Sequence, residues 1–252
     1  AVADGSSFLG ALETTSFRQW TPGAAGSVGA LDFNGDGYRD LLIGAPSSFS
    51  SDVGTLAVMK GPHVHADPDR IYTDAIDIAW EGTSASGGLG TGVASGDLDG
   101  DGYDDAVGGE HVAGGLTYVF HGSASDAGTY DAWSRRDLLL TGSEDGGEGH
   151  LGVHRVVKDL DSDGVLDLLL LDNRSPYDER SGAFGFLDLS EAATLGHADA
   201  TVRLVSQSNT GGCASAPVGF GDLNADGVED LVLSCVSEPL GGQVHLFFGT
   251  LD

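Results

Sequence analysis

A nine-residue pattern, D-x-[DN]-x-D-G-x-x-D, occurs four times in this chain of 252 residues. The first Asp residues of successive copies are 65, 62 and 63 positions apart. One match would be unremarkable in a chain with 39 acidic residues, but four at nearly constant spacing indicate a tandem repeat. The copies cover residues 32–40, 97–105, 159–167 and 222–230.

The segments around each Asp pattern also repeat. In every repeat a short segment of small residues leads into the pattern and an apolar run follows it. A Gly-led apolar stretch comes next (54–61, 114–122, 182–190 and 241–249), and a fourth stretch precedes the next repeat (77–82, 137–142 and 201–207). These stretches have the length of strands and are rich in β-branched or aromatic residues, whereas no helical period is long enough for a crossover helix. The sequence therefore predicts an all-β chain of four-stranded antiparallel units, which is the pattern of β-propeller blades.

The two ends of the chain bear on how the blades are arranged. The last repeat has no fourth stretch after 241–249, whereas residues 16–20 (SFRQW) resemble the fourth stretch at 77–82. A strand from 16–20 that completed the last blade would leave no sheet edge open. We expect one domain over residues 16–252, a ring of four blades closed by this N-terminal outer strand, with 1–15 as a tail or linker. The alternative is that the chain is a fragment of a larger propeller.

The residue types of the Asp pattern are those that bind Ca²⁺. Calcium takes several oxygen ligands, and alternate side chains of a tight loop converge on one centre. Positions one, three, five and nine supply side-chain oxygens, position seven supplies its backbone carbonyl, and the Gly at position six permits a turn with positive φ. We expect about four ions, one for each loop. The predicted ligands are Asp32, Asn34, Asp36, Tyr38 and Asp40; Asp97, Asp99, Asp101, Tyr103 and Asp105; Asp159, Asp161, Asp163, Val165 and Asp167; and Asp222, Asn224, Asp226, Val228 and Asp230.

An EF-hand begins with a similar loop, but it needs a Glu at position twelve and flanking helices. Position twelve is occupied here by Ile43, Gly108, Leu170 and Leu233, and the predicted flanks are strands. The sequence therefore argues against an EF-hand.

Charge and motifs limit the possible functions. The chain has 11 Lys and Arg residues and a formal charge of −28. Such a surface repels nucleic acids and anionic membranes, so we expect neither as a partner, and no stretch is long and apolar enough for membrane insertion. No nucleophile elbow, phosphate loop or catalytic triad pattern occurs, and most acidic clusters belong to the Asp loops. We therefore expect a binding protein rather than an enzyme.

The repeats resemble the FG-GAP (or VCBS) repeat of integrin α propellers and of many bacterial surface proteins. LLIGAP at 41–46 and LGTGVASGDLDGDG at 89–102 carry the likeness best, although integrin propellers have seven blades. The resemblance implies a secreted or cell-surface module for protein binding or cell adhesion, with its partner on the face opposite the calcium loops. On that face the longest predicted loop carries Arg174, Tyr177 and Arg180, which are residue types favoured at interfaces. Two alternatives remain: a carbohydrate-binding lectin with a glycan ligand, and an accessory domain of a secreted polysaccharide-degrading enzyme.

The chain has two cysteines, Cys213 and Cys235. They flank the last Asp loop at points that meet across the predicted hairpin. We expect a disulfide rather than two buried thiols, which would indicate an oxidising compartment.

Overall fold

The fold was analysed in a computed structural model of the chain. It describes residues 26–46, 53–61, 76–84, 87–111, 114–142, 151–172, 182–189, 194–205, 211–213, 218–237 and 243–249. Strands dominate these residues, and the helical segments among them are α2 (Ala132–Arg135) and η2 (His197–Asp199). No helix in the described ranges has the length and apolar character needed to cross a bilayer.

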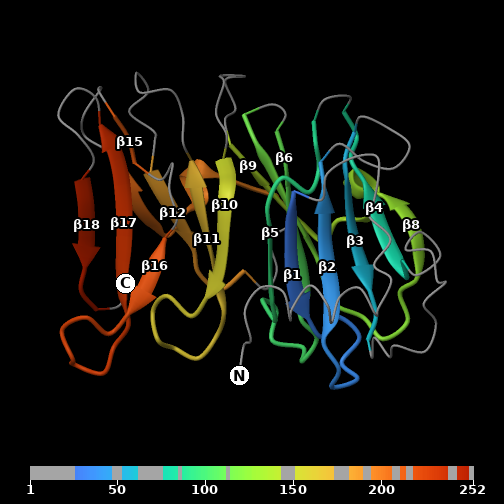
Figure 1. The fold of residues 1–252 in the computed structure, drawn as a ribbon, viewed down its shortest axis with the longest axis horizontal. Helices are drawn as coiled ribbons and strands as arrows, with labels where there is room; N and C mark the ends of the chain where they lie inside the picture. The colour runs from blue at the N-terminus through green and yellow to red at the C-terminus, as the bar shows by residue number, and fades with distance from the viewer. Residues whose placement is uncertain are drawn as a thin grey trace, which may run out of the picture.

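The strands form four separate sheets, one for each sequence repeat, which we call blades one to four (Figure 1). In blades one to three, successive strands of the blade pair antiparallel, as the repeat pattern predicted. In blade four, two short strands both pair with the strand after the Asp loop, along the same edge of it, and we count them together as the first strand of that blade. Blade one contains β1 (Ser27–Leu31), β2 (Asp40–Ala45), β3 (Thr55–Met59) and β4 (Ile78–Glu81); blade two β5 (Val93–Gly96), β6 (Asp105–Glu110), β7 (Leu116–Phe120) and β9 (Leu138–Thr141); blade three β10 (Leu151–Lys158), β11 (Asp167–Asp172), β12 (Gly182–Phe186) and β14 (Val202–Val205); and blade four β15 (Gly211–Cys213), β16 (Gly219–Gly221), β17 (Asp230–Ser237) and β18 (Gln243–Phe247).

The core lies between successive blades. Leu31, Trp80 and Phe120 belong to the cluster between blades one and two, and two further clusters join blades two and three and blades three and four. The third strands β3, β7 and β12 are buried along their whole length, so both of their faces lie against other residues. This pattern is expected where flat blades stack face to face and bury apolar area on both sides.

Two blades gain a fifth strand from the next blade in the chain. Strand β8 (Gly128–Asp131) leaves blade two and pairs parallel with β4 of blade one. Strand β13 (Thr194–Gly196) leaves blade three and pairs parallel with β9 of blade two. The sequence repeat did not predict these strands. They cover the outer edges of blades one and two and tie neighbouring blades together.

The four blades form an open row rather than the closed ring that we expected. Blade one and blade four stand at opposite ends of the row (Figure 1). In blade four, β18 is mostly exposed, and Val244, Leu246 and Phe248 each expose about half or more of their side chains. The expected closing strand at 16–20 lies outside the described residues. Within the described part of the chain, the fold is thus propeller-like but not closed.

The cysteines face each other in the backbone pairing of blade four. In the register of β15 and β17, Cys213 lies directly opposite Cys235. Opposite residues of an antiparallel pair have Cα atoms about 4.5–5.5 Å apart, which falls in the range of disulfides. The disulfide remains a prediction that fits this register.

Candidate metal centres

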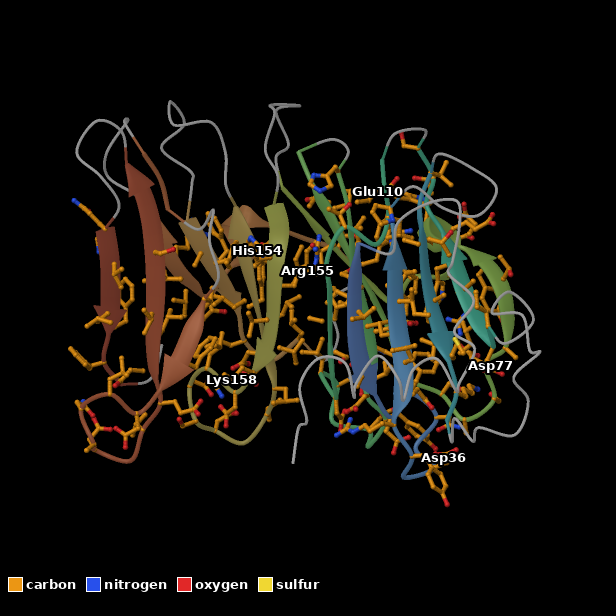
Figure 2. The ribbon with its side chains drawn as sticks, in the orientation of Figure 1. Asp36, Asp77, Glu110, His154, Arg155 and Lys158 are labelled. Carbon is orange, nitrogen blue, oxygen red and sulfur yellow. The ribbon has the colours of Figure 1, made fainter. Side chains whose placement is uncertain are left out.

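Each Asp loop connects the first and second strands of its blade. All four loops lie along the same edge of the row of blades. In Figure 1 they form the lower edge, below β1 and β2, β5 and β6, β10 and β11, and β16 and β17. Figure 2 shows Asp36 at the tip of the first loop and Lys158 beside the third, whereas Glu110 lies toward the opposite end. Since strands flank each loop, the EF-hand stays excluded.

The side chain of the first Asp in each loop accepts hydrogen bonds from backbone N–H groups of the same loop. In loop one, Asp32 Oδ2 accepts a hydrogen bond from Gly37 N–H at 2.9 Å, and Asp32 Oδ1 accepts one from Asp36 N–H at 3.1 Å. The bond from the position-six Gly to the first Asp recurs in loops two, three and four at 3.0 Å. The side chains of positions three and five accept backbone N–H groups in the same network.

Two positions of each Asp loop adopt positive φ angles. The Gly at position six has positive φ in every loop, as predicted. Position four has positive φ too, and it is occupied by Gly35, Gly100, Ser162 and Ala225. The left-handed conformation costs residues other than Gly about 1–2 kcal/mol, so the third and fourth loops hold strain that the sequence pattern did not predict.

The last Asp of each loop is the most buried member of the set. Asp40, Asp105, Asp167 and Asp230 are at most 2% exposed, and each begins the second strand of its blade. One carboxylate oxygen accepts the N–H of loop position two, such as Leu98 N at 2.9 Å from Asp105 Oδ2. The other accepts an N–H that follows the third strand, such as Gly122 N at 2.9 Å from Asp105 Oδ1. The position-nine Asp thus joins loop, second strand and third strand.

Burial changes how three of these carboxylates, Asp40, Asp105 and Asp167, ionise in the absence of a cation. Burial raises the pKa of Asp105 to about 7, although the N–H groups of Gly122 and Leu98 act to lower it. Burial likewise raises the pKa of Asp167 to about 6 and raises that of Asp40. Loops one to three therefore each hold a carboxylate whose charge is not fully compensated by its hydrogen bonds.

The donor set fits a hard cation in two loops most clearly. Carboxylate oxygens of Asp97, Asp99 and Asp101 lie within 4.8 Å of one another, as do those of Asp159, Asp161 and Asp167. Asp97 Oδ1 is buried and has no hydrogen-bond partner among the described residues. A buried oxygen without a donor is unfavourable unless a cation binds it. Loops one and four have the same hydrogen-bond network, with an Asn in place of one Asp.

Comparisons with known proteins agree with this geometry. Residues 24–59 match the FG-GAP repeat family. Over 109 residues, or 38% of the chain, the sequence is 36% identical to integrin alpha-5 of Xenopus laevis. Over 90 residues, or 31% of the chain, it is 38% identical to human integrin alpha-IIb. The chain contains an FG-GAP repeat and is similar over part of its length to integrin α subunits. It spans only about a tenth of the length of these relatives, since the matches cover 10% and 8% of them.

The family match begins just before β1 and ends with β3, so in structural terms it is the first three strands of blade one with its Asp loop. The other three FG-GAP-like repeats have the same strand order and the same loop hydrogen bonds. The predicted partner-binding residues Arg174, Tyr177 and Arg180 lie outside the described residues.

Proposed function

We propose that this FG-GAP-repeat protein binds one Ca²⁺ ion in each Asp loop and acts outside the cell as a protein-binding or adhesion module. The observation that carries the proposal is the fourfold occurrence of one loop hydrogen-bond network beside a buried Asp, with clustered carboxylates in loops two and three. The proposed ligands are the side chains at positions one, three, five and nine and the carbonyl oxygen at position seven.

Calcium fits this donor set better than magnesium does. Calcium accepts six to eight oxygen ligands in flexible geometry, whereas magnesium requires a near-ideal octahedron and retains several waters. Each loop offers up to five protein oxygens from one short segment. A carboxylate that binds the ion through both of its oxygens supplies one more. The oxygens of the position-nine Asp each accept one N–H, which leaves a second lone pair on each for a cation.

The role of calcium in the proposal is structural. A bound ion neutralises carboxylates that otherwise repel one another in a chain of charge −28. It also fixes the loop against the ends of the second and third strands. An ion that binds only the folded state stabilises that state by mass action, so millimolar extracellular calcium would hold the blades rigid.

The proposal of adhesion rests on the similarity to integrin α subunits. Rigid blades present loops at the end opposite the Asp loops, and such loops are usual sites of recognition. We propose that this face binds a protein partner and that Arg174, Tyr177 and Arg180 contribute to it. No catalytic step is part of the proposal, because the loop carboxylates are assigned to metal.

Two experiments test the two halves of the proposal. Isothermal titration with CaCl₂ and, separately, MgCl₂ should show binding of about four calcium ions and weaker binding of magnesium. For the partner, the triple variant R174A/Y177A/R180A should lose binding to immobilised extracellular-matrix proteins while its calcium-dependent melting is unchanged. Binding to a glycan array with no binding to proteins would instead favour a lectin.

A further inference from the structure

Position eight of the Asp loops, the residue just before the buried Asp, differs from one blade to the next. It is Arg39 in loop one, Asp104 in loop two, Leu166 in loop three and Glu229 in loop four. Each of these side chains lies near the boundary with a neighbouring blade, so position eight decides how adjacent loops contact each other.

At the boundary between blades one and two, Asp104 holds the first ligand residue of loop one. Asp104 Oδ2 accepts a hydrogen bond from the backbone N–H of Asp32 at 2.8 Å. The backbone N–H of Asp104 donates to the carbonyl oxygen of Asp32 at 3.1 Å. Arg39 Nη1 lies 2.6 Å from the same Asp104 Oδ2, which compensates the charge of the bridging carboxylate. Both backbone groups of Asp32 are therefore bound to a single residue of loop two.

Two further contacts make this boundary rigid. The ring of Tyr103 lies against Gly35, so closely that a Cβ atom on Gly35 would be 2.7 Å from it. The carbonyl oxygen of Phe33 accepts the N–H of Ser123 at 2.8 Å. Loop one thus contacts loop two through Asp32 and Gly35, and Phe33 contacts the segment that follows β7.

The other boundaries have weaker links at the same position. Leu166 cannot accept a hydrogen bond, and it packs with Val157 near Gly96 of blade two. Glu229 forms an ion pair with Lys158, but the Glu229 side chain is 53% exposed. Exposed ion pairs contribute little to stability, so this link is weak.

We propose that loops one and two bind calcium as a coupled pair, with Asp104 as the positioning residue, whereas loops two and three bind independently. This inference rests on the proposed calcium binding. Calcium in loop two fixes Tyr103 and Asp105, which flank Asp104 in the chain. A fixed Asp104 holds Asp32 in place, so less ordering is needed when calcium enters loop one. Coupling between two binding sites is reciprocal and commonly changes affinity about 5- to 150-fold.

The test removes calcium binding from loop two and measures loop one. Asp101→Asn alters a proposed loop-two ligand whose side chain accepts a hydrogen bond from Tyr103 N–H of the same loop. Gly102→Ala provides a second lesion, because its Cβ would meet no atom within 4 Å and acts only through the positive φ. The matched control is Asp163→Asn, the same lesion in loop three. The amide NMR signals of Gly37, Gly102, Gly164 and Gly227 follow calcium binding in each loop separately.

We expect D101N and G102A to raise the dissociation constant of loop one for calcium at least about fivefold. D163N should change the dissociation constants of loops one and two for calcium less than about twofold, and a larger effect on loop two would contradict the independence of loops two and three. Replacing the bridge by the loop-three residue, Asp104→Leu, should remove this coupling: in D104L, adding D101N no longer alters loop one. If loop one binds calcium with unchanged affinity in D101N and G102A, the proposal of coupling is wrong, whereas the proposal of calcium binding is not affected. If no glycine signal of the wild type responds to calcium, the proposal of calcium binding itself is wrong.

Discussion

Asp105 Oδ1 accepts a hydrogen bond from the N–H of Gly122 at 2.9 Å, which joins the second strand of blade two to the residue after its third strand. The same bond links Asp40 to Gly61 and Asp230 to Gly249 in blades one and four. The buried Asp therefore has a structural role that does not depend on calcium. The other acidic residues of the loop are exposed or half-buried, and their role depends on the cation.

This division of roles predicts different effects of two substitutions in one loop. Asp105→Asn replaces an acceptor oxygen by an NH₂ group that faces a backbone N–H, so it should destabilise the protein by about 1–3 kcal/mol with or without calcium. Asp101→Asn should lower stability only in calcium. Urea unfolding in excess chelator and in millimolar calcium measures both effects. Equal stability of D105N and wild type in chelator would contradict the structural role.

The raised pKa values predict that the calcium-free protein becomes less stable as pH rises. The folded state holds the proton of Asp105 up to about pH 7, whereas the unfolded chain releases it near its ordinary value of 3.8. The contribution of Asp105 to the stability of the folded state is thus fully present below about pH 4, and it is lost as the pH rises through about 7. Asp167 acts in the same direction.

In chelator, the melting temperature should fall by about 5 °C or more between pH 5 and pH 7.5. In calcium the trend should flatten or reverse, because the cation favours the ionised carboxylate. Thermal melts at matched ionic strength test this expectation. A melting temperature that rises with pH in chelator would show that burial does not control these carboxylates.

Packing between blades one and two predicts a large effect at a single aromatic residue. The rings of Trp80 and Phe120 stack with centroids 4.3 Å apart, and Trp80 is 1% exposed. Trp80→Ala should therefore cost about 3–5 kcal/mol. Trp133, which is 47% exposed and lies under Arg136, provides the matched control, and Trp133→Ala should cost less than about 1 kcal/mol. Chemical denaturation compares the two, and similar costs would contradict this core assignment.

The register of β15 and β17 predicts a disulfide in blade four. Intact mass of the protein, alkylated with and without reductant, should show two cysteines that react only after reduction. Because the bond would close a loop of moderate length, the variant C213S/C235S should lose about 3 kcal/mol of stability. Two thiols that alkylate without reductant would show that the cysteines are free.

The repeat pattern predicted the blades well because its signals are local. Alternation of small, apolar and turn residues around each Asp loop decides where strands begin, so β2, β6, β11 and β17 start at the predicted last Asp. The turn glycines Gly37 and Gly102 were predictable for the same reason, since only the backbone angle matters there.

Features that depend on contacts between repeats were not predictable from one repeat. β8 and β13 arise from pairing with another blade, and their sequences have no strong strand pattern of their own. Asp104 occupies a variable position, and its importance comes only from the neighbouring Asp32.

The position-four residues Ser162 and Ala225 adopt positive φ because the loop network requires it, although their side chains disfavour it. The expectation of a closed ring assumed a strand at 16–20, which the described residues do not include.

The most direct test is to count the bound ions. Purified protein is dialysed in 1 mM CaCl₂, passed through a desalting column in the same buffer, and analysed for calcium and magnesium by elemental analysis against protein concentration. The account predicts about four calcium ions per chain and about three for each variant in which one position-five Asp is replaced by Asn. A wild-type protein with no bound calcium, and with an unchanged melting temperature in excess chelator, would contradict it.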